Sequence, residues 1–188
     1  MTLEFKRVVT AHSSAGRSFI LHDAPPETKI IQPGRALTFF ELWETDGPLA
    51  SNEGTEDAGA RPVRHHPPKG GTRFRMVELM PDEHRQDDVI AKDFQRLDAD
   101  SVQTADNDDP TMHRNDTVDY NIVLSGEVYA VTEDGETLLK PGDVLIQRGT
   151  AHTWHNRSGK PCVFASVMVS ARPISQLQKN KREAVDHD

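Results

Sequence analysis

The chain has 188 residues, of which 35% are hydrophobic and 28% charged, and its formal net charge is −8. This size suits one domain with a single core. A negative chain without a Lys- or Arg-rich stripe repels phosphate backbones, so we exclude nucleic acid as a partner. No stretch approaches the ~20 apolar residues that cross a bilayer, and residues 1–10 lack the apolar core of a secretion signal. We therefore expect a cytoplasmic protein with no membrane partner.

In chain order, the first half predicts a few strands separated by loops. The strands are expected at residues 7–9, 18–21, 36–44 and 73–79. The polar segment 45–71 is rich in Pro and Gly, and loops of this length usually serve function, so we expect it to shape the mouth of a pocket. Its adjacent His65 and His66 point apart in an extended chain, and we interpret both as loop residues.

An acidic segment, residues 82–109, joins the two halves. Within it, Val89, Ile90, Phe94 and Leu97 have roughly helical spacing. The spacing predicts one short helix or a loop draped over the domain.

From residue 111 onward, short strand-like runs alternate with turns that contain Gly or Pro. The strands are expected at residues 117–124, 128–132, 136–139, 143–147, 151–156 and 162–169. Many short strands at this spacing are typical of an antiparallel sandwich or barrel. Cys162 lies in an apolar run and is interpreted as a small buried side chain. The polar tail after Pro173 is expected to be a frayed helix or disordered.

Two segments of this second half contain the residues that point to chemistry. Residues 111–128 read TMHRNDTVDYNIVLSGEV, and residues 140–156 read KPGDVLIQRGTAHTWHN. In this order they resemble the two signature motifs of the cupin superfamily. His113 and His152 fall on motif histidines, whereas Asn115 stands in place of the second His and Asp119 in place of the usual Glu. The resemblance covers about a third of the chain.

The resemblance implies an all-β fold, a double-stranded β-helix or jelly-roll cupin barrel with extra N-terminal strands and one or two short helices. It would form a single domain over residues 1–188. N-terminal strands and loops would occupy residues 1–110, the barrel motifs 111–170 and the polar tail 171–188. It also implies a homodimer, because pairing removes exposed sheet edges.

The resemblance further implies one divalent metal ion, held by His113, Asp119 and His152. Two imidazoles and a carboxylate suit zinc, iron, manganese and nickel alike and leave coordination positions open. Asn115 would ligate weakly or hold a metal-bound water. Strand parity alone leaves an alternative: residues 118, 120, 122 and 124 form an apolar face, and burying that face would put Asp119 in water.

Three functions follow from such a site. The first is a lyase-type reaction on a small oxygenated metabolite, meaning decarboxylation, dehydration or isomerisation, with the metal as Lewis acid. The candidate proton carriers and substrate-orienting groups are His155, Tyr120 and Arg148. The second function is an Fe(II)-dependent dioxygenase. The third is a non-catalytic small-molecule binder, which the missing second His favours.

Overall fold

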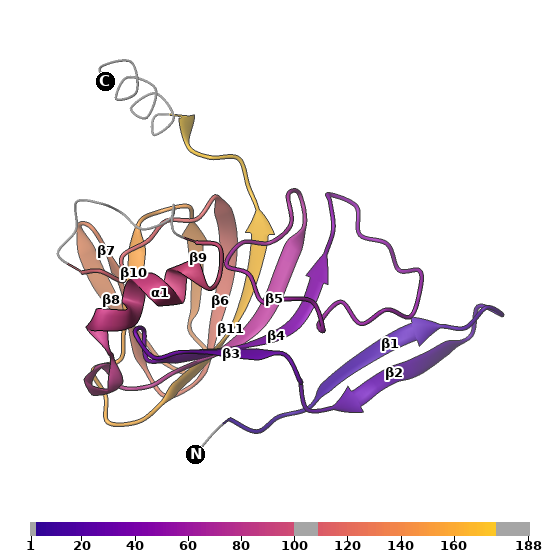
Figure 1. Cartoon of the computed structure of the whole chain (residues 1–188), viewed down its shortest axis with the longest axis horizontal. Coiled ribbons are helices and arrows are strands. Elements are labelled where there is room, and N and C mark those ends of the chain that lie inside the picture. Colours follow the sequence, from indigo (N-terminus) through magenta and orange to yellow (C-terminus); the bar gives the residue numbers. More distant parts are fainter. Residues whose placement is uncertain (1–2, 100–108, 176–188) are drawn as a thin grey trace.

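The computed structural model describes residues 3–99 and 109–175, and strands dominate it (Figure 1). The largest sheet is antiparallel, with strand order β3-β4-β5-β11-β6-β9. Its strands are β3 (Lys29–Gln32), β4 (Leu37–Thr45), β5 (Thr72–Leu79), β6 (Thr117–Ser125), β9 (Val144–Arg148) and β11 (Cys162–Ser170). A second sheet, of order β10-β7-β8, comprises β7 (Val128–Thr132), β8 (Gly135–Leu139) and β10 (His152–His155). The predicted all-β barrel is confirmed.

The interior of the barrel lies between these two sheets. Its apolar core includes Leu37, Phe39, Val77, Val123 and Phe164. Cys162 belongs to the same core and is fully buried, as its apolar surroundings predicted. Hydrophobic burial therefore surrounds the polar residues of the barrel interior and keeps bulk water away from them.

Strand β6 presents its polar face to this interior. Asp119 and Asn121 are each 4% exposed, whereas Tyr120 is 44% exposed and Ile122 39%. The alternative that parity alone left open, with the apolar face buried, is therefore wrong. A group of apolar side chains on the outside of a sheet is unusual, and this one lies on β6, next to the edge strand β9.

A short helix closes one end of the barrel, as the spacing predicted. The 3₁₀ turns η1 (Asp82–His84) and η2 (Asp87–Val89) lead into α1 (Ile90–Gln95) (Figure 1). Ile90, Phe94 and Leu97 are all at most 1% exposed and join the barrel core. None of the helices in the described ranges is both long and apolar enough to span a bilayer.

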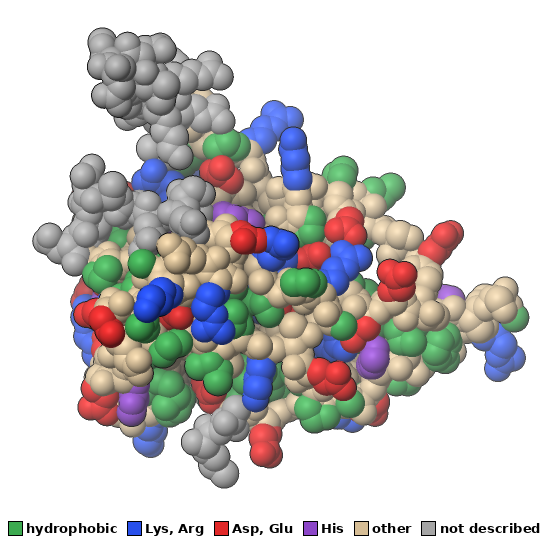
Figure 2. Space-filling view, in the orientation of Figure 1, with side chains coloured by type: hydrophobic (Ala, Val, Ile, Leu, Met, Phe, Trp, Pro, Cys, Tyr) green, Lys and Arg blue, Asp and Glu red, His purple; other side chains and the backbone are tan. Residues whose placement is uncertain are grey.

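The N-terminal strands and the long loop also agree with the sequence. Strands β1 (Arg7–His12) and β2 (Ser18–Ala24) form an antiparallel hairpin that projects from the barrel (Figure 1). Segment 45–71 joins β4 to β5 without regular structure. Figure 2 shows basic and acidic side chains interspersed over one face of the molecule. The part of the predicted tail at 176–188 lies outside the described residues.

Candidate functional site

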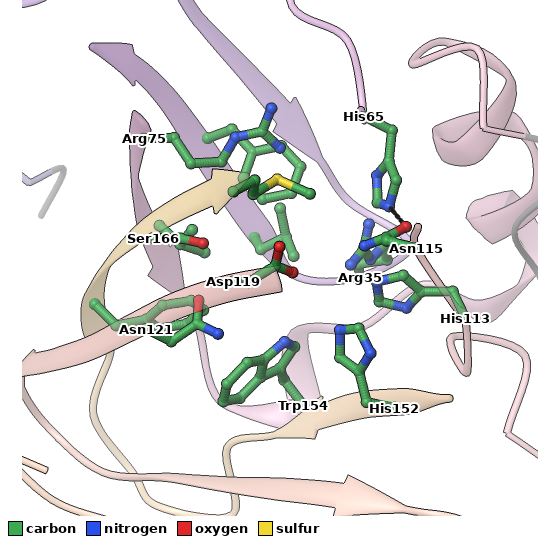
Figure 3. Close-up of a pocket in the computed structure, with 15 residues that line it drawn as sticks. Arg35, His65, Arg75, His113, Asn115, Asp119, Asn121, His152, Trp154 and Ser166 are labelled. Carbon is green, nitrogen blue, oxygen red and sulfur yellow. Dashed lines mark hydrogen bonds between the residues drawn. The ribbon is translucent and has the colours of Figure 1, made fainter. Parts of the chain in front are cut away.

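A cavity of about 40 Å³ lies inside the barrel, between β6 and β11 on one side and β10 on the other (Figure 3). It is lined by the four residues predicted to bind the metal, His113, Asn115, Asp119 and His152, and also by Arg35, His65, Arg75, Asn121, Trp154 and Ser166. This volume accommodates about three water molecules. The site is thus a small polar chamber in an apolar shell.

His113 and His152 lie side by side in this chamber because their backbones pair. The N–H of each residue donates to the carbonyl oxygen of the other, at 3.0 and 2.9 Å. The two ring centroids are 4.4 Å apart. The second cupin-like motif thereby places its histidine directly against that of the first.

The protonation of both imidazoles is fixed by burial and by one carbonyl each. Nδ1 of His113 lies 2.8 Å from the carbonyl oxygen of Thr111, and Nδ1 of His152 lies 3.0 Å from that of Thr150. A carbonyl accepts, so Nδ1 carries the hydrogen and Nε2 keeps its lone pair. Burial lowers the pKa of His113 well below its usual value and that of His152 to about 4. Both rings are therefore neutral at pH 7, in the state in which histidine binds metals.

Asp119 lines the same cavity from β6 (Figure 3). Burial raises the pKa of its carboxyl to about 6. Its Oδ1 is buried without a hydrogen-bond partner among the described residues. A buried, unpaired carboxylate oxygen costs free energy unless a cation or donor reaches it. Asp119 Oδ1 is thus a buried acceptor that a cation or a hydrogen-bond donor would stabilise.

The chemical types of these side chains suit a divalent metal ion, but their arrangement does not yet form a complete ligand set. Two neutral imidazoles and an orphaned carboxylate oxygen are ligands that divalent transition metals accept. However, within residues 3–99 and 109–175 no three His, Cys, Asp or Glu side chains converge closely enough to hold an ion. The structure brings the two histidines together and leaves Asp119 apart from them in the same chamber.

Asn115 has a different partner from the one expected. Its Oδ1 lies 2.8 Å from Nε2 of His65, so the imidazole N–H donates to the amide oxygen (Figure 3). His65 is only 2% exposed, and burial lowers its pKa well below the usual value. The interpretation of His65 as a mere loop residue is therefore wrong. One signal did exist, since adjacent histidines in an extended segment point opposite ways and one of them had to point inward.

Three predicted catalytic residues lie outside the cavity. Tyr120 and Arg148 are exposed, with Tyr120 on the outer face of β6. His155 is clamped instead between two carboxylates: its Nε2 is 2.7 Å from Asp109 Oδ2 and its Nδ1 is 3.0 Å from Asp82 Oδ2. The structure does not bring these three side chains to the chamber, and we assign them no step there.

Comparisons with known proteins agree with the barrel. A family model described as a cupin domain matches residues 102–169. The cupin-domain-containing oxidoreductase srdD of Neurospora crassa is 33% identical over 185 residues, which cover 96% of this chain and 81% of that protein. The cupin-domain-containing oxidoreductase virC of Hypocrea virens is 27% identical over 176 residues, covering 89% and 77%.

Two further matches are partial or remote. Phomopsin biosynthesis cluster protein C' of Diaporthe leptostromiformis is 48% identical over 67 residues, so this chain matches only about a third of its length (34% of each chain). A solved structure titled as a cupin-superfamily sugar phosphate isomerase from Silicibacter pomeroyi has a TM-score of 0.40 and 18% identity. That match covers 75% of this chain and 68% of the other.

Proposed function

Because the chain belongs to the cupin family, we propose that it is a metal-dependent oxidoreductase acting on a small oxygenated metabolite in the barrel cavity. The observation that carries this proposal is the pair of buried, neutral imidazoles of His113 and His152, each with Nε2 free. Relatives that match nearly the whole chain bear the name oxidoreductase, which supports this class of reaction. Asp119 is proposed to complete the ligand set.

The protein's own residues would prepare the site for an ion. The carbonyls of Thr111 and Thr150 fix the tautomer of the two histidines, so no ring has to turn or lose a proton before binding. Asp119 would exchange an unpaired buried oxygen for a cationic partner. An ion bound there supplies a Lewis acid or, if it is iron, a centre for dioxygen.

A lyase-type reaction at the same residues is the second candidate. It rests on the same pair of neutral imidazoles, since an ion that they hold would act as a Lewis acid without dioxygen. Decarboxylation, dehydration and isomerisation need no second reactant. In both candidates the walls formed by Leu37, Phe39 and Phe164 exclude water from the reacting group.

Metal content tests the shared part of both candidates. We expect elemental mass spectrometry to find close to one zinc, iron, manganese or nickel ion per chain in the purified protein. His113→Ala and His152→Ala should each lose it, whereas His84→Ala, which alters an exposed histidine, should keep it. No bound metal in the parent protein, even after reconstitution with each ion, would refute the proposal.

Oxygen uptake separates the two candidates. If the oxidoreductase proposal is right, the iron-loaded protein consumes dioxygen with a panel of small oxygenated metabolites, and the His152→Ala protein does not. Turnover without oxygen uptake would favour the lyase-type reaction. Tight binding of a metabolite without turnover would contradict both candidates and favour a non-catalytic small-molecule binder.

A further inference from the structure

The cavity contains a buried cation that the proposed metal site does not use. Arg35 lies in the turn between β3 and β4 and is 6% exposed, yet it lines the same chamber as His113 and His152 (Figure 3). Burial lowers the pKa of its guanidinium to about 10, which still leaves it charged at pH 7. A buried charge needs a partner, because it has lost the solvation of water.

Few of the five N–H donors of Arg35 have partners. Across the described ranges its guanidinium makes a single hydrogen bond, at a long 3.4 Å, with Gln32 Oε1, and no ion pair within 4 Å. It stacks over Phe94 at 4.9 Å and over Phe39 at 5.8 Å from the ring centroids. Stacking occupies the flat face of the group and leaves donors in its plane free.

Nearby charges do not satisfy Arg35. Asp93 attracts it electrostatically, but Oδ2 of that carboxylate already accepts the backbone N–H of Gly34 at 2.7 Å. The other cavity arginine, Arg75, differs: it forms an ion pair with Glu41 at 3.0 Å and donates to the carbonyl oxygen of Arg64 at 2.7 Å. Within the described residues, Arg35 therefore lacks the close carboxylate partner that Arg75 has.

The turn that presents Arg35 is held rigidly. Besides the bond from Gly34, Gln32 Nε2 donates to the carbonyl oxygen of Asp93 at 3.1 Å, and the Ala36 N–H donates to that of Pro33 at 3.2 Å. Ala36 has φ of 50°, a left-handed conformation that residues with a side chain rarely adopt. The fold thus keeps a strained turn directly beside Arg35.

We propose that Arg35 binds a carboxylate group of the substrate, so that the enzyme acts on a small carboxylic acid. The planar fork of a guanidinium matches the two oxygens of a carboxylate. The chamber of about 40 Å³ beside Arg35 admits small polar groups, and a carboxylate is one of them. The substrate class rests on the proposed function, whereas the anion site rests on Arg35 alone.

Calorimetric titration with acetate tests the anion site, with acetamide as its uncharged isostere. The metal-free and the metal-loaded protein are both titrated, together with Arg35→Gln and Arg35→Lys. Arg157→Gln is the matched control, because Arg157 is an exposed arginine paired with Glu136. Acetate at constant ionic strength, balanced with chloride, excludes a general salt effect.

The inference predicts that acetate binds the metal-free parent with a dissociation constant at least ten times lower than that of acetamide. Arg35→Gln should weaken the binding of acetate at least tenfold and Arg35→Lys should weaken it less, whereas Arg157→Gln should change it less than threefold. Equal binding of acetate and acetamide by the parent would overturn the inference without any variant, even if Arg35→Gln does not fold. Acetate binding that needs the metal and ignores Arg35→Gln would refute the Arg35 site and leave the proposed function intact.

Discussion

His155 shows how one residue couples stability to pH. Hydrogen bonds with Asp109 and then Asp82 raise the pKa of its imidazole to about 9, against 6.5 for an unperturbed histidine. Burial is the largest single influence and pushes the pKa of both carboxyls up. The hydrogen bonds from His155, together with backbone hydrogen bonds and the charge of Arg85, outweigh it and leave each pKa below its usual value. The charged cluster of Asp82, Asp109 and His155 therefore joins η1 to β10, the strand that also contains His152.

The sign of this coupling gives a first prediction. The folded-state pKa of His155 lies above the unfolded one, so its stabilisation is complete below pH 6.5 and is lost as the pH rises through about 9. We expect the advantage of the parent over His155→Ala in unfolding free energy to shrink by about 1–2 kcal/mol from pH 6 to pH 10, after allowance for solvent screening. Urea unfolding at a series of pH values measures it.

His84→Ala is the control for this experiment, because His84 is exposed and its side chain pairs with Glu83 instead of with Asp82 or Asp109. It should follow the parent at every pH. A pH-independent difference between the parent and His155→Ala would contradict the assigned clamp.

At the level of elements, the contact between the β3–β4 turn and α1 sets the end of the cavity. A Cβ on Gly34 would lie 2.7 Å from Cα and 2.8 Å from N of Ile90. These are backbone atoms of α1, so they cannot move aside as a flexible side chain does. The glycine is therefore required by close packing rather than by an unusual backbone angle.

Gly34→Ala should consequently push α1 away from the barrel and lower the unfolding free energy by about 1–3 kcal/mol. Gly135→Ala is the matched control, since nothing lies within 4 Å of a Cβ at that position in β8, and its effect should stay within about 0.5 kcal/mol. Urea unfolding compares the two. Equal effects of both substitutions would show that the tight contact is not present in solution.

The strands and the helix could largely be predicted from the sequence, and the cavity could not. Short strand-like runs separated by Gly- or Pro-containing turns predicted β6 to β11. Strand β3 was missed because four residues are too few to show a clear period. The inward face of β6 contradicts simple hydropathy, and only the motif resemblance indicated it. Arg35 and His65 come from a turn and a long loop, whose positions depend on tertiary packing against α1 and β6.

At the level of the whole molecule, the outer face of β6 and β9 exposes a group of apolar side chains. Tyr120 pairs across the strands with Ile146, and Ile122 with Val144, and all four are 39–55% exposed. Strand β9 is also an open edge of its sheet in the described part of the chain. We propose that a second copy of the chain covers this face, because two-fold pairing of one patch with itself closes both edges together.

This proposal predicts a solution mass of twice the 21.0 kDa of one chain by sedimentation. Ile146→Lys should shift the mass to that of a single chain, because an ammonium group would be buried in an apolar interface. Ile31→Lys is the matched control: Ile31 lies on β3, the opposite edge strand of the same sheet, and is 59% exposed. A parent mass near 21 kDa would refute the dimer, and dissociation by Ile31→Lys alone would place its interface on the opposite edge.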